Sequence, residues 1–380
     1  MRIAILGTYP ADPNRIEGGL HSVLCYLVEG LLQEAPDMEI HVVTGVSPGE
    51  EVVPRRVDGV WVRTFAWSRF KRLTLYQRDV ARIRRLVEEV APDLVHAQAP
   101  SAAYAVAAMT SGRPYVVTWH GVMFREAAVV PGLRAKAVYA LEVLYERYCW
   151  RRLRDVIAIS PYVEREYRGM TRARFHLIEN PISDRFFALQ GEGEPDRILC
   201  AARIIPRKDI LTLLRAFALL REERPGACLR IAGEMASEPA YAAQCLEFVR
   251  QHGLEGAVHF LGQLSEEEVL EEYQRCSLVA LSSLQETAPM TVKQALAAGR
   301  PVVATPAGGV PWLVQDGVTG FLVPFRDPER MAMAFRRLLG DAALRRWMGG
   351  QGRAEARGRF HASVVAQKTL GVYRELLSRG

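Results

Sequence analysis

The chain has 380 residues, of which 49% are hydrophobic and 24% are charged. This length predicts two domains of about 150–200 residues each, and the composition excludes an intrinsically disordered protein. The six cysteines are scattered without a C-x-x-C pair, which argues against a zinc site or a disulfide framework and indicates a reducing, cytoplasmic compartment. The opening MRIAILGTYP reads as a first strand rather than a signal peptide, and no apolar run approaches the ~18 residues of a membrane span.

The first half alternates short apolar runs with helix-period segments, which is typical of a parallel sheet covered by helices. Strands are predicted at 2–7, 39–44, 60–65, 93–98, 114–121, 155–160 and 175–180, with helices between most of them, for example at 19–32 and 76–90.

A polar, Gly-containing segment at 190–196 reads as the edge of a linker. The alternating pattern then restarts, with strands predicted at 197–204, 228–234, 258–264, 277–283, 301–306 and 320–324. Ser265 and Glu268 have the spacing of a capping box at the start of a helix. We therefore predict an α/β protein of two doubly wound, Rossmann-like domains facing across a cleft, with ligands beyond the carboxyl ends of the strands.

The net charge of +6 is unevenly spread. Ten basic residues and only two aspartates lie between Arg55 and Arg85, and five aromatic residues are interleaved with them: Trp61, Phe65, Trp67, Phe70 and Tyr76. This basic-aromatic segment suits anionic lipid head groups or an anionic acceptor. A solvated basic helix face accounts for it equally well. No recognition module accompanies it, so nucleic acid is not expected as a partner.

Candidate ligand-binding residues of the first half follow the predicted strands. Gly18 and Gly19 allow a sharp turn before a helix, although the G-x-G-x-x-G dinucleotide fingerprint is missing. His96 and His120 close two strands of one sheet. A lone histidine is usually structural, but two at strand ends favour a role in a cleft.

In the second half, Arg203 follows a strand and Lys208 precedes a helix, a placement that suits a diphosphate. Surface charges at a helix end are the common alternative. Glu286 lies in the next strand-to-helix turn.

The helix after this turn carries the remaining candidates. Pro289 suits its first turn, so the amides of Met290 and Thr291 remain available to an anion. Eight residues span a little over two helical turns, so the start of this helix and Gln294 can border one ligand of nucleotide length.

The order of these motifs resembles that of retaining glycosyltransferases of family 4, which have the GT-B fold. The motifs run through nearly the whole chain, from EGGLHSVLCYLVEGL, VVTWHG and LIENPI to ARIIPRKDILTLLRAF, QETAPMTVKQALAAGRPVVAT and GGVPWLVQDGVTGFLVP. Each motif alone is weak evidence for the family, whereas the shared order of the motifs is strong evidence. The resemblance implies transfer of a sugar from a nucleotide donor such as a UDP- or GDP-sugar, without cofactor or essential metal.

Carried over by position, the resemblance implies a role for each candidate. Gly18 and Gly19 lie near the donor phosphates and sugar, and His120 contacts the transferred sugar and assists the acceptor proton. Arg203 and Lys208 bind the diphosphate and stabilise its charge, and Glu286 holds the sugar hydroxyls. The segment around Gly262 and Leu264 lies against the base.

The chain departs from the family pattern at four positions: Pro181, Asp209, Trp312 and Gln294. The family usually has glycine at the first two and glutamate at the other two. Its glutamate at the position of Gln294 grips the ribose, so nucleotide affinity is the property affected. We predict domains at 1–183 and 184–360. Because the family's last helix often crosses back, residues 361–380 are assigned to the first domain.

The leading hypothesis is a retaining sugar transfer to a glycan or lipid-linked acceptor in cell-envelope polysaccharide or glycolipid synthesis. The enzyme is expected in the cytoplasm, with peripheral association with the inner membrane face as a further expectation. One alternative is a nucleotide-sugar epimerase or hydrolase on the same fold. Another is a non-catalytic nucleotide- or glycan-binding protein, which Gln294 favours and the retained Glu286, Arg203, Lys208 and His120 disfavour.

Overall fold

The computed structural model describes residues 1–10, 18–47, 54–57, 59–69, 71, 74–99, 102–130 and 132–379, apart from the side chains of residues 133–135. Contacts between residues divide the chain into two compact units. The first comprises Met1–Ala128, Gly132–Pro181 and Ala362–Gly380, and the second comprises Val129–Pro131 and Ile182–His361. The first unit ends at Pro181 and resumes at Ala362, and both positions lie within two residues of the boundaries expected from the sequence.

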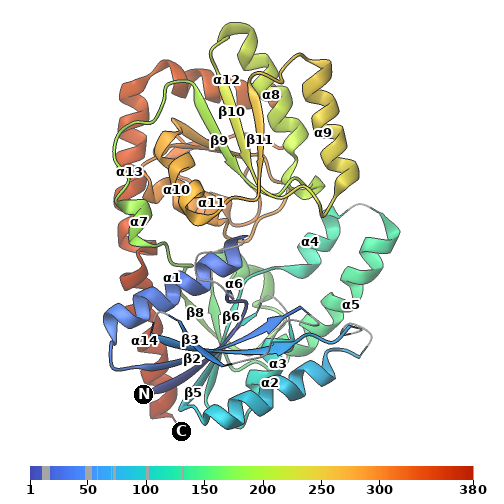
Figure 1. Cartoon of the computed structure of the whole chain (residues 1–380), viewed down its shortest axis with the longest axis vertical. Coiled ribbons are helices and arrows are strands. Elements are labelled where there is room, and N and C mark those ends of the chain that lie inside the picture. Colours follow the sequence, from blue (N-terminus) through green and yellow to red (C-terminus); the bar gives the residue numbers. More distant parts are fainter. Residues whose placement is uncertain are drawn as a thin grey trace. The chain divides into compact units, whose positions relative to one another are not determined.

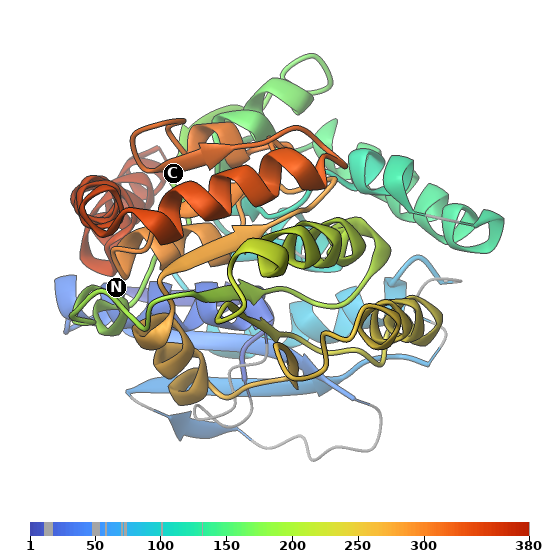
Figure 2. The same ribbon diagram turned by 90° about the horizontal axis from the view of Figure 1, so that it is seen from above.

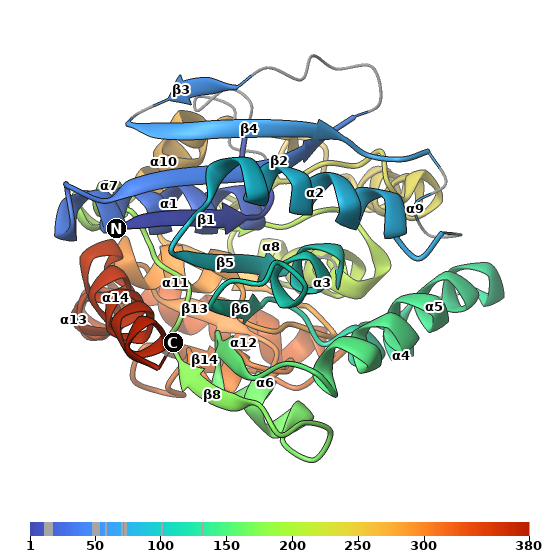
Figure 3. The same cartoon turned by 90° about the horizontal axis from the view of Figure 1, so that it is seen from below.

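The first unit is built on an eight-stranded sheet in the order β3-β4-β2-β1-β5-β6-β7-β8 (Figure 3). Neighbouring strands are parallel, except that β3 and β4 form an antiparallel pair. The strands are β1 (Arg2–Leu6), β2 (Glu39–Val46), β3 (Arg55–Val57), β4 (Val60–Ala66), β5 (Leu94–Ala99), β6 (Tyr115–Trp119), β7 (Asp155–Ala158) and β8 (Arg174–Leu177). The inner strands are apolar because helices cover both faces of a parallel sheet.

Strand β3 is absent from the sequence-based prediction. Its first two residues, Arg55 and Arg56, are exposed and charged, so no apolar run marks it. The signal that could have found it is the Asp-Gly pair at 58–59, which favours a tight hairpin. Gly59 adopts a φ of +87°, the left-handed conformation that such a turn requires.

Seven helices of the described chain accompany this sheet: α1 (Gly18–Glu34), α2 (Gln77–Val90), α3 (Ala102–Met109), α4 (Met123–Val129), α5 (Leu133–Trp150), α6 (Pro161–Tyr167) and α14 (Ala362–Ser378). The last helix, α14, packs beside α1 (Figure 1). A Cβ added to Gly30 of α1 would lie 2.4 Å from the carbonyl oxygen of Ala362. Glycine is therefore needed where the two helices approach.

The second unit contains a six-stranded parallel sheet in the order β11-β10-β9-β12-β13-β14. Its strands are β9 (Arg197–Ala201), β10 (Cys228–Ala232), β11 (Val258–Gly262), β12 (Leu278–Leu281), β13 (Val302–Ala304) and β14 (Gly320–Leu322). Each falls within a range predicted from the sequence. The two parallel sheets covered by helices confirm the predicted α/β fold class.

The helices of the second unit are α7 (Asp184–Phe187), α8 (Ile210–Glu223), α9 (Pro239–Gln251), α10 (Glu266–Arg275), α11 (Met290–Ala297), α12 (Pro328–Gly340) and α13 (Ala342–Phe360), with short 3-10 turns η1 (Pro206–Lys208) and η2 (Val310–Trp312). Helices α8 and α12 pack side by side (Figure 2). The predicted capping box is present at α10. Ser265 Oγ accepts from the Glu268 amide at 3.3 Å, and the Glu268 carboxylate accepts from the Ser265 amide at 2.8 Å.

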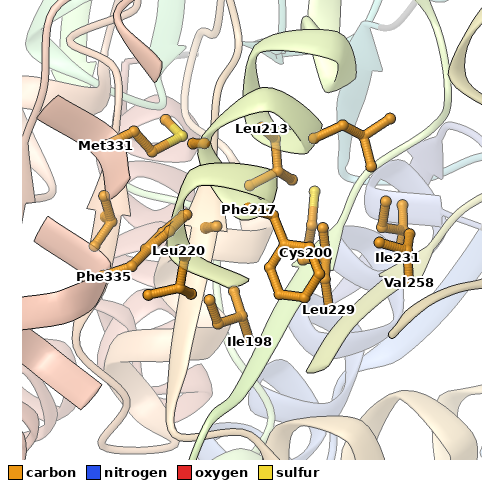
Figure 4. Close-up of a cluster of buried hydrophobic side chains, with 14 of the residues drawn as sticks. Ile198, Cys200, Leu213, Phe217, Leu220, Leu229, Ile231, Val258, Met331 and Phe335 are labelled. Carbon is orange, nitrogen blue, oxygen red and sulfur yellow. The ribbon is translucent and has the colours of Figure 1, made fainter. Parts of the chain in front are cut away.

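One apolar core holds β9 and β10 against α8 and α12 (Figure 4). Ile198 and Cys200 of β9 are fully buried against Phe217 of α8 and Phe335 of α12. Burial of one such aromatic side chain contributes about 1.5–3 kcal/mol. This packing fixes β9, so the residues that follow its carboxyl end start from a rigid position.

In the described part of the segment between Arg55 and Arg85, two of the interleaved aromatic residues do not reach the surface. Phe65 and Tyr76 are buried in the core. Arg84 and Arg85 lie 3.6 and 3.3 Å from glutamates one turn further along α2, because helical residues four apart are neighbours. Phe70 and Arg72 lie outside the described residues. Among the described helices, none is long and apolar enough to cross a membrane.

Candidate active site

Polar side chains of the second unit meet where β9 and β12, neighbours in the sheet, end. The segment after β9 carries Lys208, and the turn after β12 carries Ser283 and Glu286. Lys208 Nζ forms an ion pair with Glu286 Oε1, and Ser283 Oγ donates to the same oxygen at 2.6 Å. Glu286 is only 6% exposed. The structure thus brings together two of the predicted site residues.

A second cation at this pair, Arg207, is a residue that the sequence analysis did not single out. Its Nη1 lies 4.0 Å from Glu286 Oε2 and donates to the Gln285 carbonyl at 2.8 Å. Burial opposes ionisation of Glu286, but the charges of Lys208 and then Arg207 outweigh burial and hold its pKa below the ordinary value. Glu286 is therefore a carboxylate at neutral pH. The sequence signal that could have identified Arg207 is its position directly before Lys208.

The glycine pair at 308–309 closes around the backbone of Glu286. The Gly309 amide donates to the Glu286 carbonyl at 3.0 Å. Gly308 has a φ of +51°, and a Cβ there would lie 1.9 Å from the same carbonyl oxygen. No side chain fits at Gly308 unless the turn that presents Glu286 moves.

Helix α11 begins next to this ion pair. Pro289 is its N-cap, and Met290 is its first residue. The first amides of a helix have no partner inside the helix and carry a partial positive charge. Thr291 Oγ1 donates to the Ala201 carbonyl at 2.6 Å, so its side chain ties α11 to the end of β9. The predicted anion role of Thr291 therefore depends on its amide.

Gln294 lies about one turn after Thr291 on α11. It is buried, with 8% of its surface exposed. The hydroxyl of Tyr273, a fully buried residue of α10, lies 3.2 Å from Gln294 Oε1 and 3.1 Å from the Thr291 carbonyl. Burial raises the pKa of Tyr273 well above its ordinary value, so this hydroxyl stays protonated and can donate. Tyr273 is a further residue that the sequence analysis did not identify.

The structure places two other predicted residues outside this cluster. Arg203 follows β9 with an exposed side chain and makes no ion pair among the described residues. Its charge helps to lower the pKa of Glu234, after the larger effect of the hydrogen bond from Ser237. Leu264 is half-buried in the segment between β11 and α10.

Asp209 has a φ of +46° and a ψ of +47°, a left-handed conformation that glycine adopts without strain and aspartate tolerates. Its carboxylate accepts from Thr212 Oγ1 at 2.8 Å. This geometry explains why glycine suits the position and how aspartate replaces it.

In the first unit, His120 follows β6 and joins a buried hydrogen-bond network. Its Nε2 lies 2.6 Å from Gln98 Oε1, and Gln98 Nε2 lies 3.0 Å from His96 Nε2. His96 Nδ1 lies 2.6 Å from the hydroxyl of Tyr373 on α14. Burial, with a smaller effect of His120, lowers the pKa of His96 to about 3. His96 is 1% exposed, so its predicted role in a cleft is wrong, and it is a neutral buried residue.

The amide of Gln98 offers one hydrogen-bonding group to each histidine, because it has one acceptor and one donor. Its oxygen lies at His120 Nε2, and its nitrogen lies at His96 Nε2. Thr118 Oγ1 also lies 2.7 Å from His96 Nε2. A chain of buried polar contacts therefore links His120 through Gln98 and His96 to Tyr373 of α14.

The loop that carries His120 is held by Glu146 of α5. Its Oε1 accepts from Trp119 Nε1 and from the Met123 amide, both at 3.3 Å, and from the Tyr167 hydroxyl. These donors lie before and after His120 and on α6. Burial raises the pKa of Glu146 to about 7, against these hydrogen bonds.

Gly18 begins α1 with a φ of +79°. A Cβ there would meet nothing within 4 Å, so the backbone conformation, rather than crowding, favours glycine. Gly19 is the next residue of the helix, and residues 11–17 lie outside the described chain. Within that described chain, no group of three or more His, Cys, Asp or Glu side chains could hold a metal ion.

Two family models match adjacent parts of the chain. The model described as Glycosyltransferase Family 4 matches residues 17–186, and that described as Glycosyl transferases group 1 matches residues 183–355. Among curated relatives, the chain is 32% identical over 252 residues to an exopolysaccharide phosphotransferase of Streptomyces coelicolor, covering 65% of this chain and 24% of that protein. It is 35% identical over 163 residues to a D-inositol 3-phosphate glycosyltransferase of Corynebacterium diphtheriae, covering 42% and 38%.

Solved structures of other proteins match the fold of this chain over nearly its full length. A sucrose-phosphate synthase of Thermosynechococcus elongatus matches with a TM-score of 0.84 and 21% identity over 100% of both chains. Anabaena HepE in complex with UDP-glucose matches with a TM-score of 0.74 and 20% identity over 99% of this chain and 100% of that chain.

The fold and the polar strand ends define a two-domain α/β protein of the GT-B class. The chain belongs to the family-4 type of glycosyltransferase, with its second half in glycosyl transferases group 1. The matched region spans about a quarter to two fifths of the length of the two curated relatives named above.

Proposed function

We propose that the chain transfers a sugar from a nucleotide-sugar donor to a glycan or lipid-linked acceptor, with retention and without an essential metal. The observation that carries this proposal is the cluster of Lys208, Arg207 and Glu286 beside the first turn of α11. Two cations and a helix N-terminus suit a diphosphate, and a buried carboxylate suits sugar hydroxyls. Anabaena HepE, with the same fold, was solved with UDP-glucose, which supports a UDP-sugar as the first donor to test.

Catalysis in this proposal comes mainly from electrostatic stabilisation. Negative charge builds on the diphosphate as the glycosidic bond breaks, and fixed cations stabilise it without reorganisation. Lys208 is held in place by Glu286 before any donor binds, so the cation is positioned in advance. Arg203 is exposed beyond β9 and is proposed to contact the diphosphate once the donor is present.

His120 is proposed to contact the transferred sugar. Its Nε2 lies 2.6 Å from Gln98 Oε1, which orients the ring. Gly18 and Gly19 are proposed to approach the donor phosphates, and Leu264 to lie against the base. A non-catalytic binding protein is not favoured, since the relatives with related sequences include glycosyltransferases.

The decisive experiment measures donor binding and transfer together. Thermal shift across UDP-, GDP- and ADP-sugars identifies the donor, because a bound ligand raises the apparent stability by mass action. Lys208→Ala and Arg203→Ala should each reduce transfer at least a hundredfold, about 3 kcal/mol of lost charge stabilisation. Arg215→Ala, a surface cation on α8, is the matched control and should leave transfer unchanged. Near-normal transfer by both site variants would contradict the proposal.

A lipid-linked acceptor is supported by the surface of α5. Leu141, Leu144 and Tyr148 are exposed by 44%, 62% and 43%, and their spacing puts them on one helical face. Exposed cations flank this strip: Arg147, Arg151 and Arg152. Arg152 Cζ lies 3.9 Å from the ring centre of Tyr148. An apolar strip bordered by arginines suits the interface of an anionic membrane.

Vesicle sedimentation tests this membrane surface. Binding to anionic vesicles should exceed binding to neutral ones and should fall as salt rises, because each surface cation contributes about 1 kcal/mol near anionic lipid. Leu144→Asp should weaken binding several-fold. Leu177→Asp, at an exposed leucine of β8, is the control. Equal binding to neutral and anionic vesicles would mean that the strip is an ordinary solvated face.

A further inference from the structure

A second polar site lies in the second unit at the edge of the sheet opposite Glu286. A cavity of about 200 Å³ opens beside Ser277 and Pro301, the residues that precede β12 and β13. Because strands of a parallel sheet share one direction, their amino ends lie at the edge away from the proposed donor site. The cavity is lined by four arginines, Arg300, Arg345, Arg346 and Arg353, and by one carboxylate, Glu192.

Three of these arginines bind carbonyl groups at the carboxyl ends of three helices. Arg300 donates to the Tyr273 and Gln274 carbonyls of α10, at 3.0 and 2.9 Å. Arg353 donates to the Ala298 carbonyl, the C-cap of α11, at 2.8 Å. In the same way, Arg345 binds the last turn of α12 through the carbonyls of residues 338 and 339. These contacts fix the guanidinium groups around the cavity.

The helix ends compensate only part of the positive charge. Four guanidinium charges and one carboxylate leave an excess of three. A helix carboxyl end is equivalent to about −0.5 of a charge, so three ends leave an excess of roughly +1.5. Arg300 and Arg345 are 2% and 8% exposed, and uncompensated charge at such depth is unfavourable.

The arginines around the cavity also disfavour one another's charge. Burial lowers the pKa of Arg300 and of Arg353, and a neighbouring guanidinium adds to the effect in each case. An anion that brings several acceptor oxygens suits this uncompensated positive charge.

We propose that this cavity binds a small phosphate-bearing anion. A phosphate monoester carries about −1.5 to −2 charges at pH 7 and three strong acceptor oxygens, which matches the uncompensated charge. Glu192 now holds Arg346, with 2.9 Å between Glu192 Oε1 and Arg346 Nη1. Both side chains are about half exposed, so an entering phosphate displaces the Glu192 carboxylate and takes its place on Arg346.

Titration calorimetry with inorganic phosphate at constant ionic strength tests the proposal. Glu192→Gln should tighten phosphate binding several-fold because it removes the competing carboxylate. Gly350→Asp should weaken binding at least tenfold, because Gly350 lines the cavity and a Cβ there meets nothing within 4 Å. Gly358→Asp is the matched control. It is an exposed position of the same helix, also without a neighbour within 4 Å, and it should leave phosphate binding unchanged.

Two further measurements distinguish phosphate binding in this cavity from binding at the donor site and identify the ligand. Lys208→Ala, at the opposite sheet edge, should leave phosphate affinity unchanged. A hexose phosphate that binds tighter than inorganic phosphate, while the free hexose does not bind, would identify a phosphorylated metabolite as the ligand. Equal affinity would identify inorganic phosphate. The proposal is overturned if wild type shows no phosphate binding above chloride, or if Glu192→Gln and Gly350→Asp bind phosphate as wild type does.

Discussion

Replacing Glu146 with glutamine should stabilise the first unit at pH 8 and leave its stability nearly unchanged at pH 4.5. Glutamine keeps the oxygen that accepts from Trp119, Met123 and Tyr167. Its NH2 group replaces Oε2, which is buried without a hydrogen-bond partner among the described residues. The variant therefore resembles the protonated acid and removes the buried charge.

The magnitude follows from the pKa of Glu146, which burial raises from 4.5 to about 7. Between these values the folded chain holds a proton that the unfolded chain releases, so stability falls as pH rises from about 4.5 to 7 and is constant above. A difference of about 2.5 units corresponds to roughly 3 kcal/mol at 1.36 kcal/mol per unit. The glutamine variant lacks this fall.

Native-state hydrogen exchange of amides in β6 and α5 is the suitable assay, because a two-domain chain need not unfold in one step. The free energies of opening should diverge between wild type and Glu146→Gln as pH rises from 5 to 8. Glu142→Gln, one turn earlier on α5, is the control, since its carboxylate accepts from the Tyr76 hydroxyl and the residue is only partly buried. Parallel pH dependence in wild type and Glu146→Gln would refute the reasoning.

The remaining predictions concern the second unit. Gln294→Glu should keep or improve nucleotide affinity and Gln294→Ala should weaken it several-fold in calorimetry, since a neutral hydrogen bond is worth about 1 kcal/mol; equal affinity in all three would remove Gln294 from the site. Gly308→Ala should lower urea stability by more than Gly317→Ala, because both have positive φ but only Gly308 meets a carbonyl; equal losses would point to strain alone. Transfer should survive EDTA, and loss on chelation that manganese restores would contradict metal-independent chemistry.

The sequence predicts strands well where apolar runs mark them. All six strands of the second sheet fall in predicted ranges, because parallel strands buried on both faces need continuous apolar residues. Strand β3 escapes detection since Arg55 and Arg56 lie at an exposed edge. Edge strands face solvent and need no such pattern.

Positions of candidate side chains are predicted less completely than strands. The spacing of the motifs places Lys208 and Glu286 at two strand ends, and adjacent strands bring them into contact. Spacing alone does not distinguish His96 from His120, because both close apolar runs that predict strands of one sheet. In the structure β5 continues to Ala99, so His96 lies within the strand. His96 is buried by α14, whose Tyr373 comes from more than 270 residues further along the chain. Such long-range contacts leave no local signal in the sequence.

The two departures from the family pattern that the structure explains act on different properties. Asp209 replaces a glycine at a left-handed position, so its effect is on the backbone. Gln294 replaces a carboxylate at a site that is 8% exposed and faces Tyr273. The nearby cations Lys208 and Arg207 are already engaged by Glu286, and a second buried carboxylate would need its own compensation. A neutral amide avoids that desolvation cost and still offers an acceptor and a donor. Gln294 is therefore compatible with nucleotide binding, and its presence does not argue for a non-catalytic protein.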